Sequence, residues 1–154
     1  MFPRALQWQG KQGFRGKNML STTSQYAIRG LSCLARMQSG ETVLGRKLSE
    51  EASVPHDYLS KIMLVMRNAG LIEATRGAGG GYRLGRAPSE IRLIDIVALF
   101  EPSVTELHCV LSTGPCNDGA ACPAHDRWKQ VRTNFLEFLE GTTLAELAGI
   151  SNPR

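Results

Sequence analysis

The chain contains no hydrophobic run that approaches the roughly 18 residues required to cross a membrane, and its first residues lack the apolar segment of a secretory signal. It also lacks a carboxylate pair, a Ser/His/Asp order and a nucleotide-binding fingerprint at any recognisable spacing. We therefore expect a cytoplasmic protein that has no membrane partner and is not an enzyme. Its 154 residues are enough for one domain with appendages.

Charge is distributed unevenly along the chain, although the formal net charge is only +4. Residues 1–18 hold four basic residues and no acidic residue, and they have no helical or strand period, so we expect them to be disordered. Residues 19–87 hold nine Lys/Arg and five Asp/Glu, whereas residues 88–154 hold five and nine. A basic first half suits a polyanion partner. Solvated charge on ordinary helices is the alternative.

Residues 22–69 have the pattern of three helices, the last two of which form a helix-turn-helix. Thr22 or Ser24 is the expected N-cap of the first helix. The three helices are expected over residues 22–38, 46–52 and 56–69. In the third helix, apolar residues recur at the spacing of one helix face, at Leu59, Ile62, Met63 and Met66.

A glycine-rich hairpin is expected directly after the third helix. Two short β-like segments, residues 71–75 and 82–84, flank the run Arg76-Gly77-Ala78-Gly79-Gly80-Gly81. Consecutive glycines allow positive φ and a tight reversal of the chain. A phosphate-binding loop would instead need Gly-Lys-Ser/Thr at the start of a helix. The sequence therefore predicts a winged helix, within a mostly α fold of the α+β type.

The second half is expected to contain a cysteine-bearing loop followed by a long helix. Residues 91–100 have the pattern of a short strand that leads into a helix, and residues 103–123 have no periodicity. A helix is expected over residues 124–140, and a capping box from Thr143 to Glu146 predicts a last short helix. The apolar stripe of the long helix consists of Trp128, Val131, Phe135, Phe138 and Leu139.

Two surfaces of the winged helix carry side chains that we expect to contact DNA. A recognition helix presents base-reading side chains from its N-terminal half, and a wing reaches phosphates or the minor groove. The alternative for the helix is an ordinary polar face, but the neighbouring wing favours DNA binding. The candidates are His56, Asp57, Ser60, Lys61 and Arg67 on the third helix and Arg76, Gly77 and Arg83 on the wing.

Three of the four cysteines lie close together, at Cys109, Cys116 and Cys122, and His125 follows shortly after. Soft thiolates suit zinc or iron–sulfur centres. Structural zinc sites use tighter Cys pairs than these, so the wide gaps favour a cluster, with zinc or a redox disulfide as alternatives. His108 and Asp126 are rival fourth ligands. Cys33 stands apart within the first helix, where we expect a small packed hydrophobe.

These motifs together resemble the IscR/NsrR-type regulators of the Rrf2 family, over about residues 19–148. The resemblance implies a homodimer joined through the long helix, and gene control, usually repression, by a bound iron–sulfur cluster. Cys122-Pro-Ala-His125 followed by Trp128 resembles the IscR branch, in which three Cys and one His hold a two-iron two-sulfur cluster. The segments that carry the resemblance are Thr22-Thr23-Ser24-Gln25-Tyr26-Ala27-Ile28-Arg29, Tyr58-Leu59-Ser60-Lys61-Ile62, Gly70-Leu71-Ile72 and Arg76-Gly77-Ala78-Gly79-Gly80-Gly81-Tyr82.

The spacing of the cysteines leaves the type of cluster open. The first gap is six residues, where five is typical of the family, so a four-iron four-sulfur cluster of the NsrR kind is the alternative.

We expect three regions: a disordered extension (1–18), a winged-helix DNA-binding region (19–87), and a cluster loop with a dimerisation helix (88–154). The expected function is an iron–sulfur-dependent regulator that senses iron, redox state or nitric oxide. A zinc- or thiol-controlled regulator and an iron–sulfur carrier with a vestigial winged helix are the alternatives.

Overall fold

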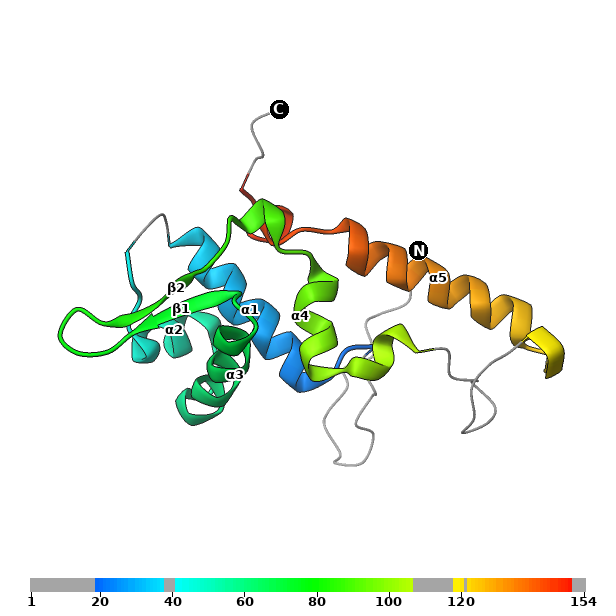
Figure 1. Cartoon of the computed structure of the whole chain (residues 1–154), viewed down its shortest axis with the longest axis horizontal. Coiled ribbons are helices and arrows are strands. Elements are labelled where there is room, and N and C mark those ends of the chain that lie inside the picture. Colours follow the sequence, from blue (N-terminus) through cyan, green and yellow to red (C-terminus); the bar gives the residue numbers. More distant parts are fainter. Residues whose placement is uncertain (1–18, 38–40, 107–117, 121, 151–154) are drawn as a thin grey trace, which may run out of the picture.

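The computed structural model describes residues 19–37, 41–106, 118–120 and 122–150, so the expected disorder of residues 1–18 lies outside the described part. The chain forms a mostly helical body with a two-stranded hairpin at one end and a long helix at the other (Figure 1). None of the helices in these ranges has the length and hydrophobicity to cross a membrane. The elements in chain order are α1 (Thr22–Arg36), α2 (Gly45–Ala52), α3 (His56–Asn68), β1 (Ile72–Thr75), β2 (Gly81–Leu84), the 3-10 turn η1 (Pro88–Glu90), α4 (Leu93–Phe100), the 3-10 turns η2 (Pro102–Thr105) and η3 (Asp118–Ala120), α5 (His125–Gly141) and α6 (Leu144–Leu147).

The three predicted helices of the helix-turn-helix region are confirmed as α1, α2 and α3. The N-cap of α1 is Ser21, not Thr22 or Ser24 as expected. Its hydroxyl accepts the Ser24 N–H at 3.1 Å, and Thr22 and Ser24 already lie inside the helix. Between α2 and α3, Ser53 takes a left-handed conformation with φ of 52°. This residue reverses the chain in a tight turn.

The predicted wing is an antiparallel hairpin in which Ile72 pairs with Leu84 and Thr75 with Gly81. A Cβ atom at Gly80 would overlap the carbonyl oxygen of Thr75, and one at Gly81 would overlap that of Val43. The backbone at Gly80 and Gly81 therefore has no room for a side chain. Val43 also exchanges both backbone hydrogen bonds with Tyr82, each 2.8 Å long, which attaches the wing to the segment before α2.

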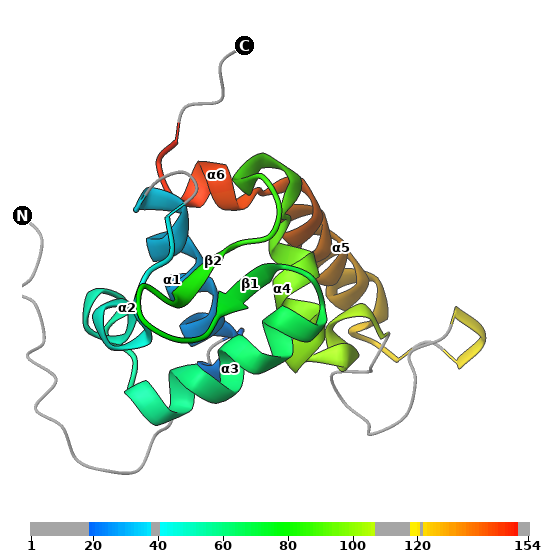
Figure 2. The ribbon, with the colours of Figure 1, turned by 60° about the vertical axis from the view of Figure 1, so that its left-hand side comes forward.

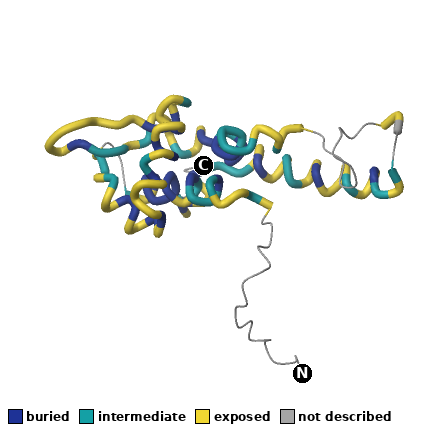
Figure 3. The backbone as a smooth tube through the Cα atoms, turned by 90° about the horizontal axis from the view of Figure 1, so that it is seen from below, coloured by how far each residue is buried: buried dark blue, intermediate teal, exposed yellow. Residues whose placement is uncertain are grey.

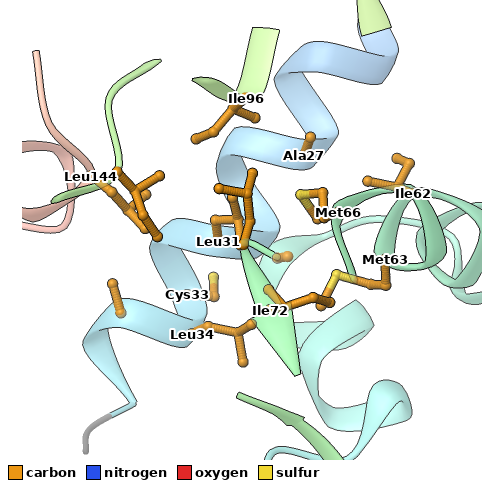
Figure 4. Close-up of a cluster of buried hydrophobic side chains, with 14 of the residues drawn as sticks. Ala27, Leu31, Cys33, Leu34, Ile62, Met63, Met66, Ile72, Ile96 and Leu144 are labelled. Carbon is orange, nitrogen blue, oxygen red and sulfur yellow. The ribbon is translucent and has the colours of Figure 1, made fainter. Parts of the chain in front are cut away.

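Helix α1 passes through the centre of the hydrophobic core. It contacts α2, α3, α4, α6 and β2. Figure 4 shows Leu31 of α1 between Met66 of α3, Ile96 of α4 and Leu144 at the start of α6. Cys33 is 5% exposed in this core, as expected for a packed hydrophobe. Side chains from both sides of the expected boundary at residue 87 therefore share one core.

The expected strand at the start of residues 91–100 is wrong. Only a single bridge forms there, between Arg92 and Thr143, and α4 begins at Leu93. The backbone N–H of Leu93 bonds the Thr142 carbonyl at 2.9 Å. The side chain of Asp95 then accepts the Arg92 N–H at 3.0 Å, which caps the helix early and leaves no room for a strand.

The long predicted helix is confirmed as α5, which extends away from the body (Figures 1 and 3). Of its expected apolar stripe, only Leu139 is buried. Val131 and Phe138 are 50% and 51% exposed. Figure 3 shows that exposed and more buried positions alternate along α5 where it extends from the body. Leu139 and Phe135 therefore belong to the core of the single chain or pack against it, whereas Val131 and Phe138 do not.

We predict that Leu31→Ala lowers the free energy of unfolding by about 2–5 kcal/mol, because Leu31 is fully buried and its removal leaves a cavity in the core. The matched control is Leu64→Ala, since Leu64 lies in a helix but is 52% exposed. It should change stability by about 0.5 kcal/mol or less. Urea unfolding followed by circular dichroism measures both, and equal losses would contradict the assignment of the core.

Candidate functional site

An open groove of about 620 Å³ lies between α3 and the wing. The two elements lie on the same side of the body in both ribbon views (Figures 1 and 2). Five of the eight residues expected to contact DNA line this groove, and they come from both elements: His56, Ser60, Arg67, Arg76 and Gly77. The remaining three lie outside it. Residues from α3, the wing and the segment before α2 thus build one concave surface of mixed polar and apolar character.

The solvent-exposed face of α3, in and beside the groove, carries charges of both signs. Lys61 and Arg67 are exposed. The Ser60 hydroxyl donates to the His56 carbonyl oxygen at 3.0 Å, so its own oxygen can still accept a hydrogen bond. Asp57 is fully exposed, and its carboxylate lies 3.6 Å from Nδ1 of His56. The acid in the first turn therefore offsets part of the positive charge that α3 presents.

On the wing, the two predicted arginines differ in their surroundings. Arg76 is exposed and forms no ion pair within the described part of the chain. Arg83 faces Glu73 across the hairpin, and its Nε donates to the Glu73 carboxylate at 2.6 Å. Pairing with Glu73 neutralises the charge of Arg83 locally, so Arg76 is the wing cation that is available to a phosphate.

Two tyrosines, which the sequence analysis did not single out, attach the start of α3 to α1. The Tyr58 hydroxyl lies 2.5 Å from that of Thr23. The Tyr58 ring meets the Tyr26 ring edge-on, with centroids 5.6 Å apart. Arg29 lies over the Tyr26 ring at 4.9 Å. These contacts fix the turn of α3 that carries the expected base-reading residues.

The expected metal ligands are only partly within the described residues. Cys109 and Cys116 lie outside them, as does the rival ligand His108. Cys122 is partly buried, and His125 is 5% exposed at the first residue of α5. The backbone N–H of His125 donates to the backbone carbonyl oxygen of Cys122 at 2.9 Å, so these two expected ligands share one turn of the chain. Within the described residues, no three His, Cys, Asp or Glu side chains form a metal-binding group.

A carboxylate that the sequence analysis overlooked meets His125. Oδ1 of Asp118 lies 2.8 Å from Nε2 of His125, and Nζ of Lys129 lies 3.0 Å from the same oxygen. The hydrogen bond from His125, together with the hydrogen bond and positive charge of Lys129, lowers the pKa of Asp118. Its position between Cys116 and Cys122 could have identified Asp118 in the sequence as a residue close to the expected ligands. The other rival ligand, Asp126, is exposed in the first turn of α5.

The segment that leads into the cysteines is attached to α1 and to α5. Glu101 accepts hydrogen bonds at the start of α1, from the Ser21 N–H at 2.8 Å and from the Ser24 hydroxyl. Burial raises the pKa of Glu101, but these hydrogen bonds outweigh it and the pKa is lowered. A few residues on, the Val104 carbonyl accepts from the buried Arg132 of α5 at 3.3 Å.

Comparison with known proteins agrees with this arrangement. The family model Rrf2, described as an iron-dependent transcriptional regulator, matches residues 20–149. The IscR regulator of Aliivibrio salmonicida (strain LFI1238) is 33% identical over 83% of this chain and 76% of its own length. The structure of CymR, the global cysteine regulator of B. subtilis, aligns with a TM-score of 0.75 at 25% identity, over 88% of this chain and 99% of that one. That of T. potens IscR aligns with a TM-score of 0.69 at 27% identity, over 86% and 88%.

We predict that the hydrogen bonds of Glu101 stabilise the fold in a pH-dependent way. Its folded-state pKa lies below the unfolded value of 4.5, so the stabilisation is fully present above pH 4.5 and is lost as the pH falls through the folded pKa. Glu101→Gln should therefore be less stable than the wild type at neutral pH, and the difference should shrink in acid. Urea unfolding at several pH values measures it. Glu137→Gln, at an exposed position of α5, is the control, and a difference that does not change with pH would contradict the assignment.

Proposed function

Because this chain belongs to the Rrf2 family of transcriptional regulators, we propose that it binds double-stranded operator DNA in the cytoplasm as a homodimeric repressor. We propose further that an iron–sulfur cluster on Cys109, Cys116, Cys122 and His125 sets its DNA affinity. The observation that carries the proposal is the groove between α3 and the wing, where residues from two elements meet.

The chemistry of the groove suits the edges of bases and the backbone of a duplex. A helix that enters the major groove reads bases through the side chains of its N-terminal half, and His56, Ser60 and Lys61 occupy that half of α3. Arg76 lies on the wing, where it can bind a phosphate. The contacts of Tyr58 with Thr23 and Tyr26 hold α3 in place, so little order has to be gained on binding.

The exposed stripe of α5 supports a second copy of the chain as its partner. Val131 and Phe138 are half exposed on a helix that extends from the body. An apolar hollow of about 250 Å³ lies beside this stripe, with Val104, Trp128 and Phe135 in its lining. Water-exposed apolar surface of this kind favours association. Pairing through α5 would place two recognition helices at a spacing set by the geometry of that helix.

The donor set suits an iron–sulfur cluster. Three thiolates and one imidazole are soft and borderline ligands that bind iron–sulfur centres, and Cys122 and His125 share one turn at the start of α5. A two-iron two-sulfur cluster is favoured, with a four-iron four-sulfur cluster as the alternative. When bound, the cluster would supply a centre that responds to iron supply, redox state or nitric oxide.

The described contacts offer a physical connection between the segment that carries the expected cluster ligands and the DNA-binding helix α3. Binding of the four ligands to a common centre would hold residues 103–124 in one arrangement and fix the direction of α5. Glu101 attaches the same segment to the first turn of α1, and Thr23 attaches that turn to Tyr58 of α3. Linkage between two sites of this kind is typically worth about 1–3 kcal/mol.

We predict that α3 and the wing contribute differently to DNA binding. Ser60→Ala or Lys61→Ala should change the preference among operator variants, by about 1–3 kcal/mol for a lost base contact. Arg76→Ala should weaken binding evenly across sequences and reduce the salt dependence by about one phosphate contact. Competition binding at fixed salt, repeated over a salt series, measures both effects. If neither region affected binding, the DNA-binding surface would lie elsewhere.

We predict that His125→Ala gives a labile cluster, because the imidazole is the weakest of the four ligands. His125→Cys should retain the cluster but lower its potential, since thiolate ligation favours the oxidised form more than imidazole does. His108→Ala, the control, should do neither. Anaerobic absorbance, iron and sulfide content and redox titration measure these outcomes.

Three results would redirect the proposal. A colourless protein that contains zinc would indicate a zinc-controlled regulator, and a metal-free protein whose DNA affinity follows thiol oxidation would indicate a redox switch. A loaded protein that binds no operator would indicate an iron–sulfur carrier. Should His125→Ala keep wild-type iron content and potential while His108→Ala or an Asp126 variant loses them, the fourth ligand would be another residue.

A further inference from the structure

The imidazole of His125 has a carboxylate partner, Asp118, which is not one of the four expected metal ligands. The imidazole is buried at the first residue of α5, and its Nε2 lies 2.8 Å from Oδ1 of Asp118. Lys129, one helical turn after His125, donates to both oxygens of the same carboxylate, at 3.0 and 3.3 Å. His125 and Lys129 of α5 therefore both contact the carboxylate of Asp118, which lies in the segment between Cys116 and Cys122.

The identity of the partner determines which nitrogen carries the proton. An ionised carboxylate can only accept a hydrogen bond, so the 2.8 Å contact requires a hydrogen on Nε2 of His125. A neutral imidazole has one N–H, and its lone pair then lies on Nδ1. A metal binds the nitrogen that bears the lone pair, and the other nitrogen commonly donates to a carboxylate that fixes the ring.

We propose that Asp118 is the positioning residue of the metal centre, which holds the His125 imidazole with Nε2 protonated so that Nδ1 is the atom that binds iron. This inference rests on the proposed cluster function and adds a residue outside the ligand set. Lys129 supports it by restricting the Asp118 carboxylate, whose side chain is otherwise 77% exposed. The same contacts join the segment between Cys116 and Cys122 to α5.

The first test uses the cluster-free protein and needs no bound metal. With ¹⁵N-labelled histidine, NMR reports which ring nitrogen is protonated, and the signals that vanish in His125→Gln belong to His125. We expect protonated Nε2 in the wild type. Asp118→Asn keeps an acceptor oxygen and should keep this tautomer, whereas Asp118→Ala should lose the preference. Glu137→Gln, a carboxylate-to-amide change at an exposed position of α5, should leave the signals unchanged.

The second test uses protein loaded anaerobically with iron and sulfide. Histidine labelled with ¹⁵N at Nδ1 alone or at Nε2 alone distinguishes the ligating atom by pulsed electron paramagnetic resonance of the reduced cluster. We expect the strong coupling from Nδ1. Asp118→Ala should speed removal of iron by a chelator roughly 10- to 100-fold. Both Asp118 variants should raise the potential, because each removes a negative charge beside the ligand, whereas Glu137→Gln should change neither property.

The outcomes separate this inference from the proposed function. An unprotonated Nε2 in the cluster-free wild type, or a strong coupling from Nε2 in the loaded protein, would overturn the role of Asp118 while leaving cluster binding intact. Wild-type chelator resistance and potential in Asp118→Ala would also overturn it. A wild-type protein that takes up no cluster would instead refute the proposed function, and the NMR result would still decide whether Asp118 sets the His125 tautomer.

Discussion

The enclosure of α1 by the other helices is the constraint on which the rest of the structure depends. Leu31 and its neighbours on α1 lose contact with water only because α2, α3, α4 and α6 all pack on this helix. Hydrophobic burial of this kind supplies most of the stability of a small domain. Its consequence here is geometrical. Helix α3 and the segment that leads into the cysteines are both positioned against α1, so neither can shift without disturbing that core.

Polar contacts at the start of α1 fix how α3 and the segment that leads into the cysteines sit against this helix. A buried apolar core fixes how deeply helices pack but tolerates some sliding, whereas hydrogen bonds between named atoms do not. Ser24 is fully buried and donates to Glu101, and the neighbouring Thr23 meets Tyr58 of α3. One turn of α1 therefore joins the segment that leads into the cysteines with the first turn of α3. A charge at Glu101 is tolerated because its partners offset the cost of burial.

The sequence predicted those parts of the molecule that local pattern controls. The helices and the glycine-tipped hairpin follow from periodicity and backbone preference, which act over a few residues. Contacts between distant residues were not predictable in this way. Nothing local distinguishes Arg83, which pairs with Glu73 across the hairpin, from the exposed Arg76. Asp118 likewise looks like a loop residue until α5 brings His125 to it. Metal binding by Cys109, Cys116, Cys122 and His125 stays a prediction, and the first two lie outside the described residues.

The glycines at the hairpin tip have an evolutionary consequence. Any side chain at Gly80 or Gly81 would collide with the backbone of Thr75 or Val43, so substitution there damages the hairpin before it can alter recognition. New operator preferences must then arise at positions whose side chains are free to vary. The exposed surface of α3, with Ser60 and Lys61, is such a place, since its core-facing residues are separate. Under the proposed function, substitutions that change operator preference would therefore collect on α3 and not at Gly80 or Gly81.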